Sequence, residues 1–263
     1  MRRACCIGSM VDVWPPRRGV VHSASAGAVN LRLGEAWWTL LAADRSDQPS
    51  GIRLTSDAPG LPAIRTGDPV EVRAGHLRVA NAVIDCRAAT RWDPGAWPLA
   101  SGGLQARLRW LEIAALRRAW AGAASMAQVL CKALAEDDLA LAAAVRGVVG
   151  RGPGLTPSGD DVIVGLLTAL DMQRGAARER LARALAPALP TTTDLSRHLI
   201  AEAAQGLRGR ALHELGAALL SGVDLAAATE RALAVGASSG GDAAIGLVAG
   251  CRHLFPAPER AVP

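Results

Sequence analysis

The sequence of 263 residues lacks tyrosine, and it has one phenylalanine, Phe255, and one lysine, Lys132. Arginine supplies the other basic residues, and no basic run is longer than two residues. A nucleic-acid surface usually clusters positive charge among aromatic side chains, so this composition argues against one. The net charge of +5 supports no more than a weak attraction for anions.

Long apolar runs and metal-binding motifs are also missing. No apolar run approaches the roughly 20 residues that a membrane-spanning helix needs. The basic start of the chain leads into no apolar stretch of the signal-peptide kind. The five cysteines form no CxxC pair, which argues against a disulfide framework or a zinc site. Because half of the residues are hydrophobic, we expect a folded cytoplasmic protein that does not act at a membrane.

The spacing of apolar residues predicts two domains. Up to residue 95 apolar residues alternate, as in Val29, Leu31 and Leu33, and the alternating stretches 70–72 and 77–79 flank a turn that is typical of a hairpin. We predict a small antiparallel, barrel-like β domain over residues 1–95. After residue 100 the spacing becomes helical, so we predict a larger α-helical domain over residues 96–263. The fold class is therefore α+β.

The helical part is punctuated by glycine and proline. Leu104, Leu108, Leu111, Ala115 and Leu116 share one face of the first helix. The tryptophans 92, 97, 110 and 120 are interpreted as packing the junction between the two domains, and stacking on a ligand is the alternative. The later helices are predicted near 124–149, 159–173, 176–187, 194–207, 210–221, 224–235 and 240–253.

The stretch GRGPGLTPSGDDVIVGLL, residues 150–167, differs from its Ala- and Leu-rich surroundings. Its glycines let backbone N–H groups approach a ligand, and the N-terminus of the following helix adds more of them, which suits a phosphate or a carboxylate. Asp160 and Asp161 suit a divalent cation, an amino group or an amide N–H instead. The stretch therefore predicts a site for a small molecule with an anionic end and an N–H-bearing end, or for a phosphate with Mg²⁺.

A similar stretch occurs 81 residues later. Ser158-Gly159-Asp160-Asp161 corresponds to Ser239-Gly240-Gly241-Asp242, and Gly165 corresponds to Gly246. We predict two equivalent helix starts that face one cleft. The alternative is purely structural: serine caps the helix, the acidic residue suits the helix dipole, and the helices cross at their glycines.

The sequence GPGLTPSGDDVIVG resembles the signature of a bacterial family that includes the AllH-type subunit of oxamate carbamoyltransferase, from anaerobic allantoin and purine breakdown. The resemblance extends to a small β domain, to a Thr/Ser-rich helix start at 191–196 and to the late Ser-Gly-x-Asp element. The family pattern has a bulky residue where this chain has Gly241 and a polar one where it has Ala237. The resemblance implies carbamoyl exchange between oxalurate and phosphate, which gives oxamate and carbamoyl phosphate, in a complex with other subunits.

The predicted site combines the loop with the helix starts. We predict that Asp160 and Asp161 are catalytic, that a small anion is the substrate, and that Mg²⁺ is the one cofactor the aspartates suggest. The predicted substrate-binding residues are Gly152, Gly154, Leu155, Thr156, Ser158, Gly159, Thr193, Ser196, Ser239, Gly240 and Asp242. The alternative is a non-catalytic binding or assembly subunit. An enzyme needs the two aspartates in an open cleft, whereas caps can be buried.

Overall fold

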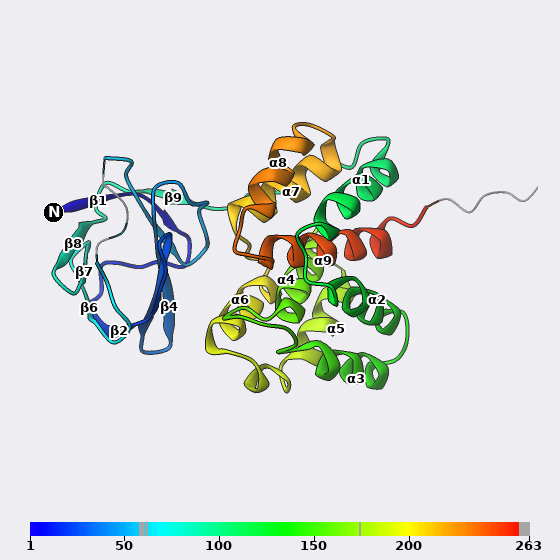
Figure 1. Cartoon of the computed structure of the whole chain (residues 1–263), viewed down its shortest axis with the longest axis horizontal. Coiled ribbons are helices and arrows are strands. Elements are labelled where there is room, and N and C mark those ends of the chain that lie inside the picture. Colours follow the sequence, from blue (N-terminus) through cyan, green and yellow to red (C-terminus); the bar gives the residue numbers. More distant parts are fainter. Residues whose placement is uncertain (58–60, 62, 174, 258–263) are drawn as a thin grey trace, which may run out of the picture. The chain divides into compact units, whose positions relative to one another are not determined.

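The computed structural model describes residues 1–57, 61, 63–173 and 175–257. The chain divides into two compact units, Met1–Gly95 and Ala96–Pro263. The first contains the strands and the second contains the helices (Figure 1). This arrangement confirms the α+β fold class.

The N-terminal unit is a closed barrel of eight strands. The hydrogen-bonded order is β5-β4-β3-β2-β6-β7-β8-β1, and β1 closes the barrel by pairing with β5, while β9 adds to β1 outside the ring. Fully buried side chains such as Leu31, Leu40, Leu77 and Ile84 fill its core. The strands are β1 Arg2–Gly8, β2 Arg17–Ala24, β3 Ala28–Leu33, β4 Ala36–Leu41, β5 Gly51–Leu54, β6 Pro69–Arg73, β7 His76–Val79, β8 Ala82–Asp85 and β9 Thr90–Trp92.

The prediction of antiparallel pairing is right for most of the barrel. The predicted hairpin is β6–β7, with Val70 opposite Val79 and Val72 opposite Leu77. Three pairings between described strands are parallel, namely β1–β8, β1–β9 and β4–β5. A tight turn would force β5 to run against β4, but the long connection between them lets the chain return in the same direction. The barrel also starts at Arg2, although β1 shows no clean alternation that would reveal it.

The described part of the second unit contains nine α-helices and one short 3₁₀-helix. The predicted helix 124–149 is two helices, because Asp137 begins α3 by accepting a hydrogen bond from the Ala140 N–H at 2.8 Å. The helices are α1 Leu104–Leu116, α2 Ala123–Leu134, α3 Asp138–Val148, α4 Ser158–Asp171, α5 Ala176–Leu185, η1 Leu189–Thr191, α6 Asp194–Ala204, α7 Arg210–Ser221, α8 Leu225–Leu233 and α9 Ser239–Leu254.

One packing prediction for α1 is wrong. Leu116, which was expected on the buried face, is 50% exposed. Trp110 and Trp120 are 46% and 40% exposed, and their packing at the domain junction stays a prediction. The buried face of α1 consists of Leu104, Leu108, Leu111 and Ala115. Ala115, four residues after Leu111, takes the next position on the buried face, so Leu116 points away from that face.

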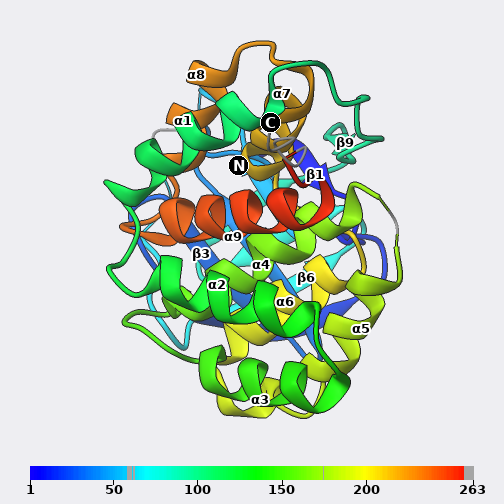
Figure 2. The ribbon, with the colours of Figure 1, turned by 90° about the vertical axis from the view of Figure 1, so that its right-hand side faces the viewer.

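Helices α4 and α9 form the centre of the helical unit and lie against each other (Figure 2). They cross at the two predicted glycines. A Cβ atom on Gly165 would lie 1.9 Å from the carbonyl oxygen of Ala243, and one on Gly246 would lie 2.0 Å from that of Val162. Ala243 and Val162 are themselves 81 residues apart, so each helix meets the other in the same way. The sequence similarity therefore corresponds to an approximate two-fold relation between the helices.

The glycines at the second position of each helix also touch backbone. A Cβ atom on Gly159 would lie 2.1 Å from the Val148 carbonyl oxygen at the end of α3, and one on Gly240 would lie 2.0 Å from that of Ala232 in α8. Both helix starts are thus pressed against the end of the preceding helix. Glycine at these positions has a packing reason that is independent of any ligand.

Gly147 offers a contrast because nothing lies within 4 Å of its added Cβ atom and its φ is not positive. We expect Gly147→Ala in α3 to raise the free energy of unfolding by about 0.5–1 kcal/mol, since alanine loses less backbone entropy in a helix. Thermal or urea denaturation of the two proteins checks this. A loss of stability would show that α3 does not have the open side described here.

Candidate functional site

The structure brings the two predicted helix starts together. The hydroxyl oxygens of Thr156, in the loop before α4, and Ser239, the first residue of α9, are 2.9 Å apart. Both hydroxyls also lie against the carboxyl group of Asp161. Residues from the loop, from α4 and from α9 therefore meet at one place.

Asp160 fastens the loop to its surroundings. Its Oδ1 accepts a hydrogen bond from the Gly150 N–H at 2.8 Å, and its Oδ2 accepts one from the Thr192 hydroxyl. The residue is 1% exposed, and burial raises the pKa of its carboxyl group, although these donors and the Ser196 hydroxyl oppose that shift. Both oxygens already have partners, so the geometry supports a positioning role for Asp160.

Asp161 has a different environment from its neighbour. It is 7% exposed, and its Oδ2 has no hydrogen-bond partner among the described residues. Burial raises the pKa of its carboxyl group to about 8; the Ser239 and Thr156 hydroxyls act against this, and the charges of Asp242 and Asp160 add to it. A carboxyl group with this pKa holds its proton at neutral pH and releases it slightly above.

Asp242 occupies the position in α9 that corresponds to Asp161. It is completely buried, and its Oδ1 accepts a hydrogen bond from the backbone N–H of Trp120 at 2.7 Å. Its Oδ2 has no partner among the described residues. No ion pair within the described ranges involves Asp160, Asp161 or Asp242, so hydroxyl groups and backbone N–H groups are what surround these acids.

The two helix starts differ at one position, where α4 has Asp160 and α9 has Gly241, and this difference has a steric reason. At the position that corresponds to Asp160, α9 has Gly241, where a Cβ atom would lie 2.6 Å from the backbone nitrogen of Ala119. The end of α1 therefore occupies the space that a side chain would need. A larger side chain at position 241 does not fit this backbone.

The predicted serine caps are wrong. Helix α4 has Pro157 at its N-cap and α9 has Ser238, and neither cap makes a side-chain hydrogen bond. The Ser158 hydroxyl is buried and has no partner among the described residues. The Ser196 hydroxyl is also buried and lies near the Asp160 carboxyl group, but it does not make a hydrogen bond of regular geometry with any described residue. Thr193 does act as the cap of α6, because its hydroxyl accepts from the Ser196 N–H at 3.1 Å.

The glycine-rich loop presents unused backbone donors. Gly152 and Gly154 have φ values of +107° and +98°, and Leu155 is 54% exposed. The Thr193 hydroxyl donates to the Leu155 carbonyl at 2.7 Å and holds the loop. Among the described residues, the N–H groups of Gly152, Gly154, Leu155 and Thr156 find no acceptor. Adjacent free amides beside a helix N-terminus are suited to an anion.

An enzyme was expected to hold its aspartates in an open cleft, but the three aspartates of the site are buried. Asp160, Asp161 and Asp242 are 1%, 7% and 0% exposed, so within the described ranges their carboxyl groups do not line an open cleft, whereas the loop at 151–155 is exposed. Within the described ranges, no group of three or more His, Cys, Asp or Glu side chains is arranged to hold a metal ion. None of the described helices combines the length and the apolar character needed to cross a membrane.

Comparison with protein families gives two matches along the chain. The family described as oxamate carbamoyltransferase subunit AllH matches residues 148–251, and the AllH family N-terminal domain matches residues 8–91. The chain belongs to the AllH family. Comparisons with curated proteins and with solved structures give no match. The AllH match includes all predicted site residues from Gly152 to Asp242.

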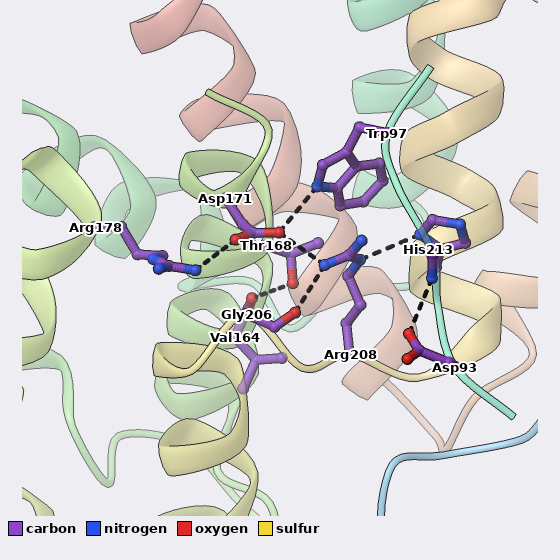
Figure 3. Close-up of polar contacts among 10 residues, drawn as sticks. Asp93, Trp97, Val164, Thr168, Asp171, Arg178, Gly206, Arg208 and His213 are labelled. Atoms are coloured by element: carbon purple, nitrogen blue, oxygen red, sulfur yellow. Dashed lines mark hydrogen bonds and ion pairs between the residues drawn. The ribbon is translucent and has the colours of Figure 1, made fainter. Parts of the chain in front are cut away.

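This AllH-family chain has a second buried polar cluster, at the opposite end of α4 (Figure 3). Asp171 accepts hydrogen bonds from Arg178, from Arg208 at 2.7 Å and from the Trp97 indole N–H at 3.0 Å. The Arg208 guanidinium is 3.9 Å from the centre of the Trp97 ring. The cluster joins the segment before α1, helix α5 and the α6–α7 loop to the end of α4.

The Asp171 cluster has a structural explanation. A carboxylate near the C-terminus of a helix is unfavourable toward the helix dipole, and the two arginines compensate for it. Removing one partner of a buried ion pair costs about 3–5 kcal/mol, so this cluster holds α4 firmly. Sequence reasoning missed it because its residues come from four separate segments. In contrast to the Asp161 end, this end of α4 has its charges paired.

Proposed function

We propose that this chain is the component of oxamate carbamoyltransferase that binds the carbamoyl-bearing anion at the two helix starts. The supporting observation is that hydrogen-bond donors without acceptors and acceptors without donors both occur at the candidate site. The amides of residues 152 and 154–156 lack acceptors, while the Oδ2 atoms of Asp161 and Asp242 lack donors, among the described residues. Thr156 connects the two sets because its hydroxyl lies against Asp161. The two buried Oδ2 atoms cost stability unless a ligand or water satisfies them, whereas the loop of residues 151–155 is exposed, so its free amides are accessible to an anion.

The substrates of carbamoyl exchange carry the complementary groups. Carbamoyl phosphate has a phosphate at one end and an NH₂ group at the other, and oxalurate has a carboxylate and several N–H groups. In the proposed binding mode, the loop amides and the Ser158 hydroxyl hold the anionic end. The carbamoyl NH₂ donates to the free oxygens of Asp161 and Asp242.

The proposed reaction needs one group that accepts a proton. The amide nitrogen of oxamate attacks the carbamoyl carbon, the bond from that carbon to the phosphate oxygen breaks, and the nitrogen loses a proton as oxalurate forms. Asp161 is suited to take this proton because a base works best when its pKa lies close to the working pH. Asp160 then serves to hold the loop in place.

A non-catalytic binding or assembly role is the second candidate, and the burial of the aspartates favours it. Ligand access to Asp161 requires the loop at 152–156 to move, since Gly152 lies against Ser158. The two candidates differ in one measurement. An enzymatic chain forms oxalurate from oxamate and carbamoyl phosphate when purified alone, whereas a binding subunit binds carbamoyl phosphate without turnover.

Gly154→Ala tests the role of the loop. An added Cβ atom meets nothing closer than 3.9 Å, but alanine is strained at a φ of +98°, so the loop must change its conformation. We expect the affinity for carbamoyl phosphate to fall at least about 10-fold, the loss of roughly one charge-assisted hydrogen bond. The melting temperature should change little because the loop is exposed. Calorimetric titration with and without Mg²⁺ measures the affinity.

Gly102→Ala is the matched control, since Gly102 is exposed, has no positive φ and has nothing within 4 Å of its added Cβ atom. It should bind like the wild type. Equal affinity of the Gly154 and Gly102 variants would contradict the role of the loop. Absence of binding by the wild-type chain to carbamoyl phosphate, oxamate and oxalurate would contradict the proposed function itself.

A further inference from the structure

The outer side of α1 is apolar although no described residue of the helical unit covers it. Trp110, Ile113 and Leu116 follow one another at three-residue spacing, so they lie on one side of the helix. Their exposed fractions are 46%, 57% and 50%. We call these three residues, together with Arg109 and Arg117, the α1 face.

The charge on the α1 face is entirely positive. Arg109 and Arg117 are exposed and lie between the apolar side chains around the helix. Neither guanidinium makes an ion pair or a hydrogen bond with any described residue. The acidic residue of this helix turn, Glu112, is directed elsewhere, because its carboxylate binds Arg252 of α9 at 2.6 and 2.7 Å.

A groove borders the α1 face. It has a volume of about 350 Å³ and lies among α1, α2 and α9, which are neighbours in Figure 2. Glu112 lines it and is one helical turn from Leu116, so the groove lies next to the α1 face along the same helix. Its floor is apolar and includes Ala127, Ile245 and Val248. The charged groups that line it are already paired, because Arg252 binds Glu112 and Lys132 lies 3.9 Å from the Glu136 carboxylate.

We propose that the α1 face and the adjoining groove form the docking site for another subunit of oxamate carbamoyltransferase, which presents an apolar anchor flanked by acidic side chains. Tryptophan and arginine are the residues that most often dominate binding energy at protein interfaces. The unpaired guanidinium groups require acidic partners for complementarity. A second copy of this chain fits poorly, because a symmetric contact would bring the same arginines together. The inference rests on the proposed function only in taking the enzyme to have further subunits.

Charge reversal and apolar-to-acidic substitutions on the α1 face test the proposal. We expect Ile113→Glu, and separately the double variant Arg109→Glu with Arg117→Glu, to raise the Kd for the purified remaining subunits about 30-fold or more, the size of a hot-spot loss. The melting temperature should stay close to the wild-type value because these side chains are exposed. Leu139→Glu, at a leucine 76% exposed in α3, and Arg146→Glu in the same helix are the matched controls.

The possible results separate the explanations. Unchanged affinity of both α1 variants, or equal losses in the α3 controls, overturns the docking site. A change in self-association of the chain alone, measured by sedimentation velocity, overturns it in favour of a second copy. Carbamoyl phosphate affinity of the same variants should match the wild type, since the α1 face is separate from the 152–156 loop. If the wild-type chain does not bind carbamoyl phosphate, that result counts against the proposed function and not against the docking site.

Discussion

Gly165→Ala is expected to lower the free energy of unfolding by about 3 kcal/mol or more, at the upper end of the cost of overpacking a core. The added Cβ atom would lie 1.9 Å from the Ala243 carbonyl oxygen and 2.9 Å from the Leu247 nitrogen. Both are backbone atoms of α9, so no side chain can turn away to make room. The two central helices must separate, and separation loosens the packing of the residues buried around the crossing. Urea denaturation of the purified variant measures the loss.

The two-fold relation between the helices gives a strict control. Gly246→Ala should cost about as much as Gly165→Ala, because its Cβ atom would lie 2.0 Å from the Val162 carbonyl oxygen. The double variant should cost less than the sum, since helices already separated by the first methyl group have room for the second. Gly147→Ala should act in the opposite direction. A loss below about 1 kcal/mol at Gly165 would mean that the helices do not cross as closely as described.

The close crossing of α4 and α9 could be predicted from the sequence because glycine in the middle of a helix is unusual. Glycine inside a helix lowers stability unless a second backbone approaches it, and Gly165 and Gly246 occupy equivalent positions in two similar stretches. The alternation at Val70, Val72 and Leu77 likewise predicted a hairpin that the structure confirms. The hairpin is a local pattern. The crossing joins distant helices, but it is visible because the same pattern occurs in both of them.

Features that depend on distant segments could not be predicted. The barrel closes because β1, from the start of the chain, pairs with β5 and β8, and no local pattern identifies those partners. The Asp171 cluster joins Trp97, Arg178 and Arg208, which are far apart in the sequence. In each case the deciding interaction is between residues that the pattern alone does not associate.

The different environments of Asp160 and Asp161 at the candidate site could not be predicted from the sequence either. The two residues are adjacent and chemically identical, and both were predicted to be catalytic, although only Asp161 has an acidic counterpart, Asp242, in the second stretch. Successive residues on a helix point about 100° apart, so Asp160 faces Gly150 and Thr192 while Asp161 faces Thr156 and Ser239. The first carboxylate finds two donors and the second keeps an oxygen without a partner. Only the packing of α6 and α9 against α4 decides which aspartate has which environment.

Asp161→Asn is expected to stabilise the protein at pH 8 and to leave its stability almost unchanged at pH 4. The pKa of the Asp161 carboxyl group rises from 3.8 to about 8 on folding, so the folded protein favours the protonated form. Below about pH 4 the folded and unfolded chains both hold the proton, and the group costs nothing. Between about pH 4 and pH 8 folding must take up a proton, and the stability falls as the pH rises.

The size of this effect follows from the shift. One pKa unit corresponds to 1.36 kcal/mol, so the cost reaches up to roughly 5 kcal/mol at pH 8. Asparagine keeps the shape of the side chain and carries no charge, which removes the cost. The difference in melting temperature between Asp161→Asn and wild type should therefore grow from pH 4 to pH 8. Asp137→Asn, at the exposed cap of α3, is the control, since asparagine caps a helix as well as aspartate does.

The same variant separates a functional carboxyl group from a structural one when its affinity for carbamoyl phosphate is also measured. The raised pKa predicts a gain in stability at pH 8 whether or not Asp161 contacts a ligand, so the affinity is the measurement that separates the two roles. If Asp161 has only a structural role, asparagine leaves binding unchanged. If Asp161 accepts an N–H of the ligand, binding at pH 8 weakens by roughly 1.5–3 kcal/mol, the scale for a hydrogen bond to a charged group. A carboxyl group that the fold keeps at a cost to its own stability, with a free oxygen beside an exposed glycine loop, is expected of a binding site.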